Sequence, residues 1–133
     1  HTSEPRKIKK MHNSYVREGG VVLFNWGVHC NDEECMENYM TNNAIPAIKA
    51  LLDHPQPHRY TVMWREHEPQ HFQSPDGLYH PDVGILKHTC RTDLIHFNNY
   101  RNEIAEKYLK EDDLLMKVPI VRIFELLKPL HYL

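Results

Sequence analysis

The sequence predicts a single α/β domain built around a parallel sheet, because three short apolar runs alternate with two helical patterns along its 133 residues. Such alternation is typical of parallel strands joined by crossover helices. Hydrophobic residues make up 41% of the chain and charged residues 26%, a mixture that can bury a core. The three strands match the last three of a flavodoxin-like, three-layer sandwich. We therefore expect residues 1–133 to be one incomplete domain, with two further strands upstream of this chain.

The first strand is expected at 21–24, where apolar residues follow one another as in a parallel strand covered on both faces. A helical pattern then runs from Glu33 to Asp53, and Asp32 can cap it. Because Pro46 cannot donate a backbone hydrogen bond, we expect two helical pieces with a break near 41–44. The side chains expected to face inward are Met36, Tyr39, Met40, Ile45, Ile48, Leu51 and Leu52.

The second strand is expected at 59–64, followed by a charged cluster and a long irregular stretch from Gln73 to Lys87. A second helix is expected from Thr92, with Leu94, Phe97, Tyr100, Ile104 and Tyr108 facing inward. Its outward residues are expected to be Arg101, Glu103, Glu106 and Lys107. The third strand is expected at 117–124, and Pro119 places it at a sheet edge because proline has no N–H for the ladder.

Two of these strands end in polar clusters, which parallel pairing would bring to the same edge of the sheet. After the first strand, Asn25 can donate its amide to a developing oxyanion, and Gly27 permits a tight turn. After the second strand, Arg65 can hold an anionic group and His71 can move a proton. The simpler alternative is a charged loop that only solvates the end of a strand.

Composition limits the classes of function. The net charge of -2 gives no reason to expect nucleic acid as a partner, and no apolar run approaches the length of about 20 residues that spans a membrane. The eleven histidines show no metal-site spacing, so we expect no metal and no cofactor. A zinc site formed by His29, Cys30, Cys35 and Cys90 is the weaker alternative. Cys30 and Cys35 are also close enough in sequence to pair, and Cys90 can pair with a residue outside this chain.

An ordered set of motifs resembles the PC-esterase domain of the GDSL/SGNH hydrolase superfamily, which plant trichome birefringence-like polysaccharide O-acetyltransferases share. The similarity spans most of residues 20–124. The motifs that carry it are Leu23-Phe24-Asn25-Trp26-Gly27, Met63-Trp64-Arg65-Glu66, Pro69-Gln70-His71-Phe72, Gly77 and Cys90.

This resemblance implies an SGNH-hydrolase-like fold and an esterase or O-acyltransferase that acts on a carbohydrate or glycoconjugate. It implies an acyl donor and a carbohydrate acceptor, or an ester substrate, in the Golgi, the secretory pathway or the extracellular space. Asn25 and Gly27 would form part of the oxyanion hole. The expected substrate-binding residues are Arg65, Glu66, His71 and Phe72.

The sequence departs from the family at both ends of the catalytic machinery. It has no Gly-Asp-Ser block for the nucleophile, and Asp93-Leu94-Ile95-His96 has the family's Asp-x-x-His spacing but falls on an expected helix. We therefore expect the chain to be an inactive fragment of an esterase or O-acyltransferase, with any membrane anchor outside it. The alternative is a non-catalytic binding or interaction domain that kept the scaffold without the triad.

Overall fold

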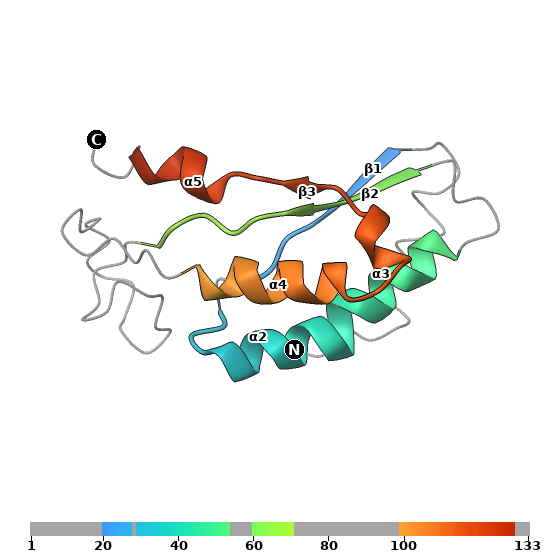
Figure 1. The fold of residues 1–133 in the computed structure, drawn as a ribbon, viewed down its shortest axis with the longest axis horizontal. Coiled ribbons are helices and arrows are strands. Elements are labelled where there is room, and N and C mark those ends of the chain that lie inside the picture. Colours follow the sequence, from blue (N-terminus) through green and yellow to red (C-terminus); the bar gives the residue numbers. More distant parts are fainter. Residues whose placement is uncertain (1–19, 28, 54–59, 71–98, 130–133) are drawn as a thin grey trace.

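The computed structural model describes residues 20–27, 29–53, 60–70 and 99–129, and it confirms an α/β fold with a parallel sheet. The strands are β1 (Gly20–Phe24), β2 (Tyr60–Arg65) and β3 (Ile120–Val121), in the order β1-β2-β3 (Figure 1). β1 pairs with β2 along its whole length, whereas β3 pairs only with the last two residues of β2. The expected loop at 73–87, the start of the second helix and Cys90 lie outside the described residues.

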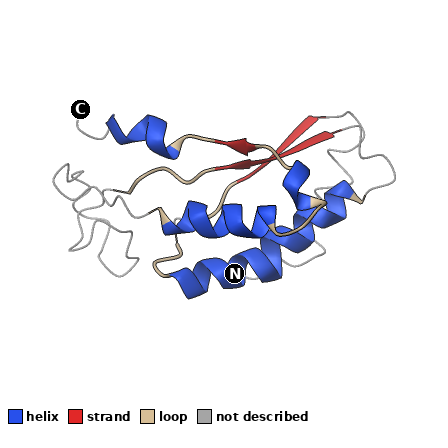
Figure 2. Ribbon diagram, in the orientation of Figure 1, coloured by secondary structure: helices blue, strands red, loops and turns tan. Residues whose placement is uncertain are grey.

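The helices between the strands lie on one face of the sheet (Figures 1 and 2). The first connection contains α2 (Glu33–Tyr39), a π-helical segment (Met40–Ala44) and α3 (Ile45–Leu52), and the second contains α4 (Tyr100–Lys110). β2 is added beside β1, and β3 is added beside β2 at the same edge of the sheet. Because connections between parallel strands are right-handed, two successive connections in the same direction lie on the same face of the sheet. Accordingly, α2 packs against α4.

The first helix forms as its sequence predicts, except that it widens where a break was expected. Asp32 caps α2, since its side-chain oxygen accepts a hydrogen bond of 2.7 Å from the backbone N–H of Cys35. At 40–44 the helix becomes π-helical, and the N–H of Ile45 donates five residues back to the carbonyl of Met40. Pro46, which has no N–H to donate, follows this wider turn and is accommodated without ending the helix.

The hydrophobic core lies between these helices and the face of the sheet that they cover. Trp64 of β2 is the largest of its fully buried side chains. The inward face predicted for the first helix is confirmed, with Tyr39, Ile45 and Leu52 only partly buried. The buried core cluster comprises Cys30, Met36, Met40, Ala44, Ile48, Leu51, Val62, Trp64, Tyr100, Ile104, Ala105, Leu109, Leu115 and Val118.

The prediction that the first strand is covered on both faces is wrong. Val21 is 65% exposed and Leu23 is 50% exposed, whereas Val22 and Phe24 pack against the core. Alternate residues of a strand point to opposite faces, and the described helices cover only one of them. The apolar run therefore reflects one buried face and one uncovered face.

The third strand is much shorter than the predicted 117–124. Lys117 belongs to a 3-10 turn (Leu115–Lys117), and α5 (Phe124–Leu127) begins directly after the strand. The carboxylate of Glu66 accepts the backbone N–H groups of Ile123 and Phe124 at 2.8 and 2.9 Å, which turns the chain out of the sheet. Pro119 precedes β3 at the edge of the described sheet, as expected from its missing donor.

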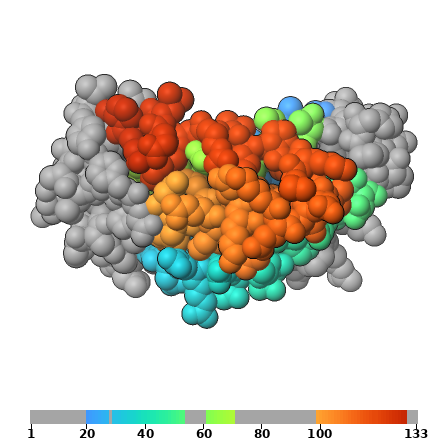
Figure 3. All heavy atoms as spheres, in the orientation of Figure 1, coloured from blue at the N-terminus to red at the C-terminus, as the bar shows by residue number. Residues whose placement is uncertain are grey.

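α4 occupies the middle of one face of the molecule, beside α2 (Figure 3). Its predicted inward residues Tyr100 and Ile104 are buried, and Tyr108 is partly buried. The prediction that Arg101 lies outward is wrong, because only 4% of this residue is exposed. Farther along the helix, Glu106 forms two hydrogen bonds of 2.5 and 2.6 Å with Arg122, which tie α4 to the segment after β3.

The ion pairs of Glu106 predict a specific loss of stability in acid. Arg122 and Lys110 lower the pKa of Glu106 from its ordinary value of 4.5 to about 2. A lowered carboxyl pKa adds stability that is fully present above the ordinary value and is lost as the pH falls through about 2. Urea unfolding between pH 5 and pH 2 should therefore show a smaller loss of stability in Glu106→Gln than in the wild type.

Glu103→Gln provides the control, because Glu103 is an exposed carboxylate of the same helix with no ion pair in the described part of the chain. This variant measures how the loss of one carboxylate charge from α4 by itself changes the stability against urea. A Glu106→Gln profile parallel to that of the wild type would contradict this interpretation of the ion pairs.

Candidate functional site

The ends of β1 and β2 meet at the carboxyl edge of the sheet, as the sequence predicts for parallel neighbours. Asn25, the first residue after β1, donates through its side-chain nitrogen to the carbonyls of Arg65 and Glu66, at 3.1 and 3.2 Å. The amide that was expected to serve an oxyanion is therefore engaged with the end of β2. To donate to a ligand, Asn25 would have to give up one of these carbonyls.

Gly27 brings the chain after β1 into close contact with α4 and with the end of β2. Its φ angle is +142°, a backbone conformation that L side chains rarely adopt. A Cβ at this position would lie 2.9 Å from Cδ of Arg101 and 3.3 Å from Cδ2 of His67. The turn expected at Gly27 thus also provides the space in which these two side chains pack.

The first turn of α4 holds both strand ends. The hydroxyl of Tyr100 and Nε of Arg101 donate to the carbonyl of Cys30, at 2.5 and 2.7 Å. On the other side, Asn102 accepts from the backbone N–H of His67 at 2.6 Å and donates to its carbonyl at 2.9 Å. His67 lies beyond the end of β2. There the side chain of Asn102 makes the two backbone hydrogen bonds that a neighbouring strand would otherwise make.

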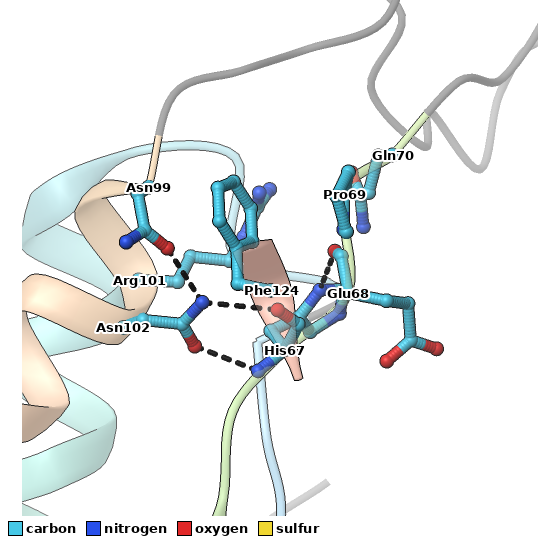
Figure 4. A pocket seen from close by; sticks show the side chains of 8 residues that line it. All are labelled: His67, Glu68, Pro69, Gln70, Asn99, Arg101, Asn102 and Phe124. Carbon is cyan, nitrogen blue, oxygen red and sulfur yellow. Dashed lines mark hydrogen bonds between the residues drawn. The ribbon is translucent and has the colours of Figure 1, made fainter. Parts of the chain in front are cut away.

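A small pocket opens between the end of β2 and the first turn of α4, and Figure 4 shows side chains from both segments around it. It has room for about one water molecule and is partly open to solvent. The lining residues are His67, Glu68, Pro69, Gln70, Asn99, Arg101, Asn102 and Phe124.

His67 is the histidine that the structure places in this site. Its Nδ1 lies 2.6 Å from the carbonyl oxygen of Glu68, so Nδ1 carries the proton and Nε2 is left as an acceptor. Burial lowers the pKa of His67, which favours the neutral imidazole. His71 and Phe72, expected to bind substrate, lie outside the described residues, and their predicted roles stay predictions.

Of the other two residues expected to bind substrate, Glu66 is the more firmly engaged. It is 5% exposed, and its carboxylate accepts the two N–H groups at the start of α5 together with Nη1 of Arg122 at 2.9 Å. Arg65 is partly exposed and lies 3.2 Å from the carboxylate of Glu68. A ligand could reach Arg65 more readily, whereas at Glu66 it would have to displace Arg122 or the two backbone N–H groups.

Cys30 and Cys35 form a disulfide with a Cα–Cα distance of 5.3 Å, which joins the loop after β1 to the first turn of α2. This confirms the pairing that their spacing allowed. Both sulfurs are used, so the alternative zinc site loses two of its four ligands. No group of three or more metal-binding side chains gathers within the described ranges.

Sequence reasoning missed Arg101 and Asn102. It also singled out His71, which lies outside the described residues, and gave no role to His67. Arg101 and Asn102 follow Tyr100 at what proves to be the start of the described helix, and polar residues there resemble a solvated face. The available signal was that Tyr100, which was expected in the core, is followed by Arg101 and Asn102, so that three consecutive side chains carry hydrogen-bonding groups. That run does not reveal that backbone groups after two strands are its partners.

No family model, curated protein or solved structure matches this chain. Within the described ranges, none of the helices combines the length and the apolar character needed to cross a membrane. The functional assignment therefore depends on the residues and geometry of the site.

The contact at Gly27 predicts a measurable loss of stability. Gly27→Ala should lower the free energy of unfolding by about 1–3 kcal/mol, because the new Cβ is strained at a positive φ and collides with Arg101. Gly20→Ala is the matched control, since a Cβ there meets nothing within 4 Å. Urea unfolding of both variants gives the comparison, and equal stability would contradict the close packing of Gly27 against Arg101.

Proposed function

We propose that this chain is the central part of an esterase or O-acyltransferase domain that acts on a carbohydrate or glycoconjugate. The observation that carries the proposal is the meeting of Asn25 and Gly27 with the end of β2 at the carboxyl edge of a parallel sheet. Open α/β sheets bind their ligands at this edge. The resemblance to the PC-esterase domain then suggests which reaction takes place there.

In the proposed reaction, a serine oxygen loses its proton and forms a bond to the acyl carbon, while the bond from that carbon to the donor oxygen breaks and the donor leaves as an alcohol with that proton. Water or a sugar hydroxyl then forms a bond to the acyl carbon, the bond to the serine oxygen breaks, and the acceptor's proton returns to the serine. Asn25 donates to the tetrahedral oxyanion after leaving one of its two carbonyl partners. Ser3, Ser14 and Ser74 lie outside the described residues and none follows Gly-Asp, so the proposal takes the nucleophile from polypeptide outside this sequence.

The finer fold assignment, a flavodoxin-like three-layer sandwich of the SGNH type, belongs to the same proposal. It is supported by the parallel order β1-β2-β3, which equals the order of the last three strands in that fold. It is also supported by the exposed side chains of Val21 and Leu23 on the face that the described helices leave uncovered. A third layer would bury these two side chains.

The proposed location is the Golgi, the secretory pathway or the extracellular space. The disulfide between Cys30 and Cys35 supports it, because disulfides form and persist in oxidising compartments. The proposed partners are an acyl donor and a carbohydrate acceptor, or an ester substrate.

A non-catalytic binding domain is the second candidate, and one observation favours it. Two polar groups proposed for catalysis and for substrate binding are engaged within the protein: Asn25 with two carbonyls and Glu66 with three donors. Such engagement is expected when these side chains hold the edge of the sheet together rather than wait for a substrate.

Acetate release from p-nitrophenyl acetate separates the two candidates. The complete product of the gene should hydrolyse this ester, the 133-residue chain should not exceed the buffer rate, and Asn25→Ala should slow the complete enzyme by about a hundredfold. Asn38→Ala removes the same side chain from an exposed position on α2 and serves as the control.

Because Asn25 also joins the two strands, the rates are compared at a temperature at which urea unfolding shows both variants to be folded. A complete product that is no faster than buffer would exclude esterase activity on this substrate and favour the binding domain. A folded Asn25→Ala enzyme with the wild-type rate would remove Asn25 from the oxyanion hole.

A further inference from the structure

Arg101 is a buried cation without an anionic partner in the described structure. Only 4% of it is exposed, and its Nη2 atom is fully buried with no hydrogen-bond partner among the described residues. None of the ion pairs within these residues includes Arg101. A buried charge without a partner is strongly destabilising, so proteins rarely keep one unless something else pairs with it.

The other described arginines show how unusual this arrangement is. Arg65 lies beside the carboxylate of Glu68, and Arg122 contacts the carboxylates of Glu66 and Glu106. Both are more exposed than Arg101, so water already solvates part of their charge. The arginine that most needs an anion is thus the one for which the described part of the chain supplies none.

The guanidinium of Arg101 is held in place by its neighbours. Its Nε donates to the carbonyl of Cys30, its Cδ packs where Gly27 has no side chain, and its Cζ lies 4.7 Å from the centre of the Tyr100 ring. Burial lowers the pKa of Arg101, but arginine starts from so high a value that it stays charged. The site therefore holds a positive charge in a fixed position that is almost entirely shielded from solvent.

Arg101 is one of the side chains that line the pocket between the end of β2 and the first turn of α4 (Figure 4). We propose that this pocket is an anion-binding site, in which Nη2 of Arg101 receives an oxygen of a carboxylate, phosphate or sulfate group. The space for about one water molecule suits a single oxygen, while the rest of the ligand would lie toward solvent. The inference depends only on the surroundings of Arg101 and stands whether or not the domain is an esterase.

Thermal unfolding of the full-length protein tests this site with acetate, inorganic phosphate and sulfate as separate probes at constant ionic strength. At least one of them should raise the Tm in a saturable manner, while sodium chloride at the same ionic strength should not. The probe with the greatest effect identifies the class of anion. Arg101→Met should weaken the apparent affinity for that anion by about tenfold or more, because it removes a charged hydrogen bond.

Lys107→Met is the matched control, since it removes one positive charge from an exposed position of the same helix. It should keep the wild-type response to the anion. A chloride effect as large as that of the probes, an unchanged affinity in Arg101→Met, or no response of the wild type to any probe would overturn the proposal.

A second measurement covers the case in which Arg101→Met does not fold. Backbone amide signals of Gly27 and Asn102 in the wild-type protein are followed by NMR during a titration with the same anions. Saturable shifts at both residues are expected, because Gly27 packs on the side chain of Arg101 and Asn102 lines the pocket. Signals that do not move, or that move in proportion to salt, would overturn the proposal.

Discussion

The first turn of α4 is the constraint on which the edge of the sheet depends. Backbone groups that continue past the end of a strand lose their partners in the sheet and must find others. Here Tyr100 and Arg101 satisfy the carbonyl of Cys30, and Asn102 satisfies both backbone groups of His67. One helical turn thus fixes the chain after β1 and the chain after β2 relative to each other, and it fixes the pocket between them.

Two buried charged side chains at this edge, Glu66 and Arg101, differ in the hydrogen-bond partners that surround them. Glu66 is as buried as Arg101, but the segment after β3 supplies its carboxylate with Arg122 and two backbone N–H groups. A saturated carboxylate of this kind stabilises the junction between β3 and α5 and has little capacity left for a ligand. Arg101 differs, because it carries a fixed positive charge and its Nη2 donor has no hydrogen-bond partner among the described residues. Since both residues are buried, hydrogen bonding rather than burial distinguishes the structural charge of Glu66 from the charge of Arg101, which we propose binds an anion.

The sequence predicts those parts of this fold that depend on local pattern. Apolar periodicity locates the inward face of the first helix, and Asp32 marks its start. The length of β3 is not predictable in this way, because it is limited by Glu66, which lies 57 residues before its partner Ile123. The burial of Arg101 likewise depends on distant residues, Gly27 and the carbonyl of Cys30. Patterns along one segment describe its own periodicity, but not which other segment completes its hydrogen bonds.

The proposed anion site and His67 are electrostatically linked. Burial lowers the pKa of His67, and the charges of Arg101 and Arg65 lower it further, while the backbone hydrogen bond and the charge of Glu68 act in the opposite direction. An anion at Arg101 would cancel part of the positive charge that opposes protonation. Binding would then favour a proton on His67, and by reciprocity that proton would favour the anion. The same pocket would therefore bind an anionic group and a proton together, at the edge where Asn25 joins β1 to β2.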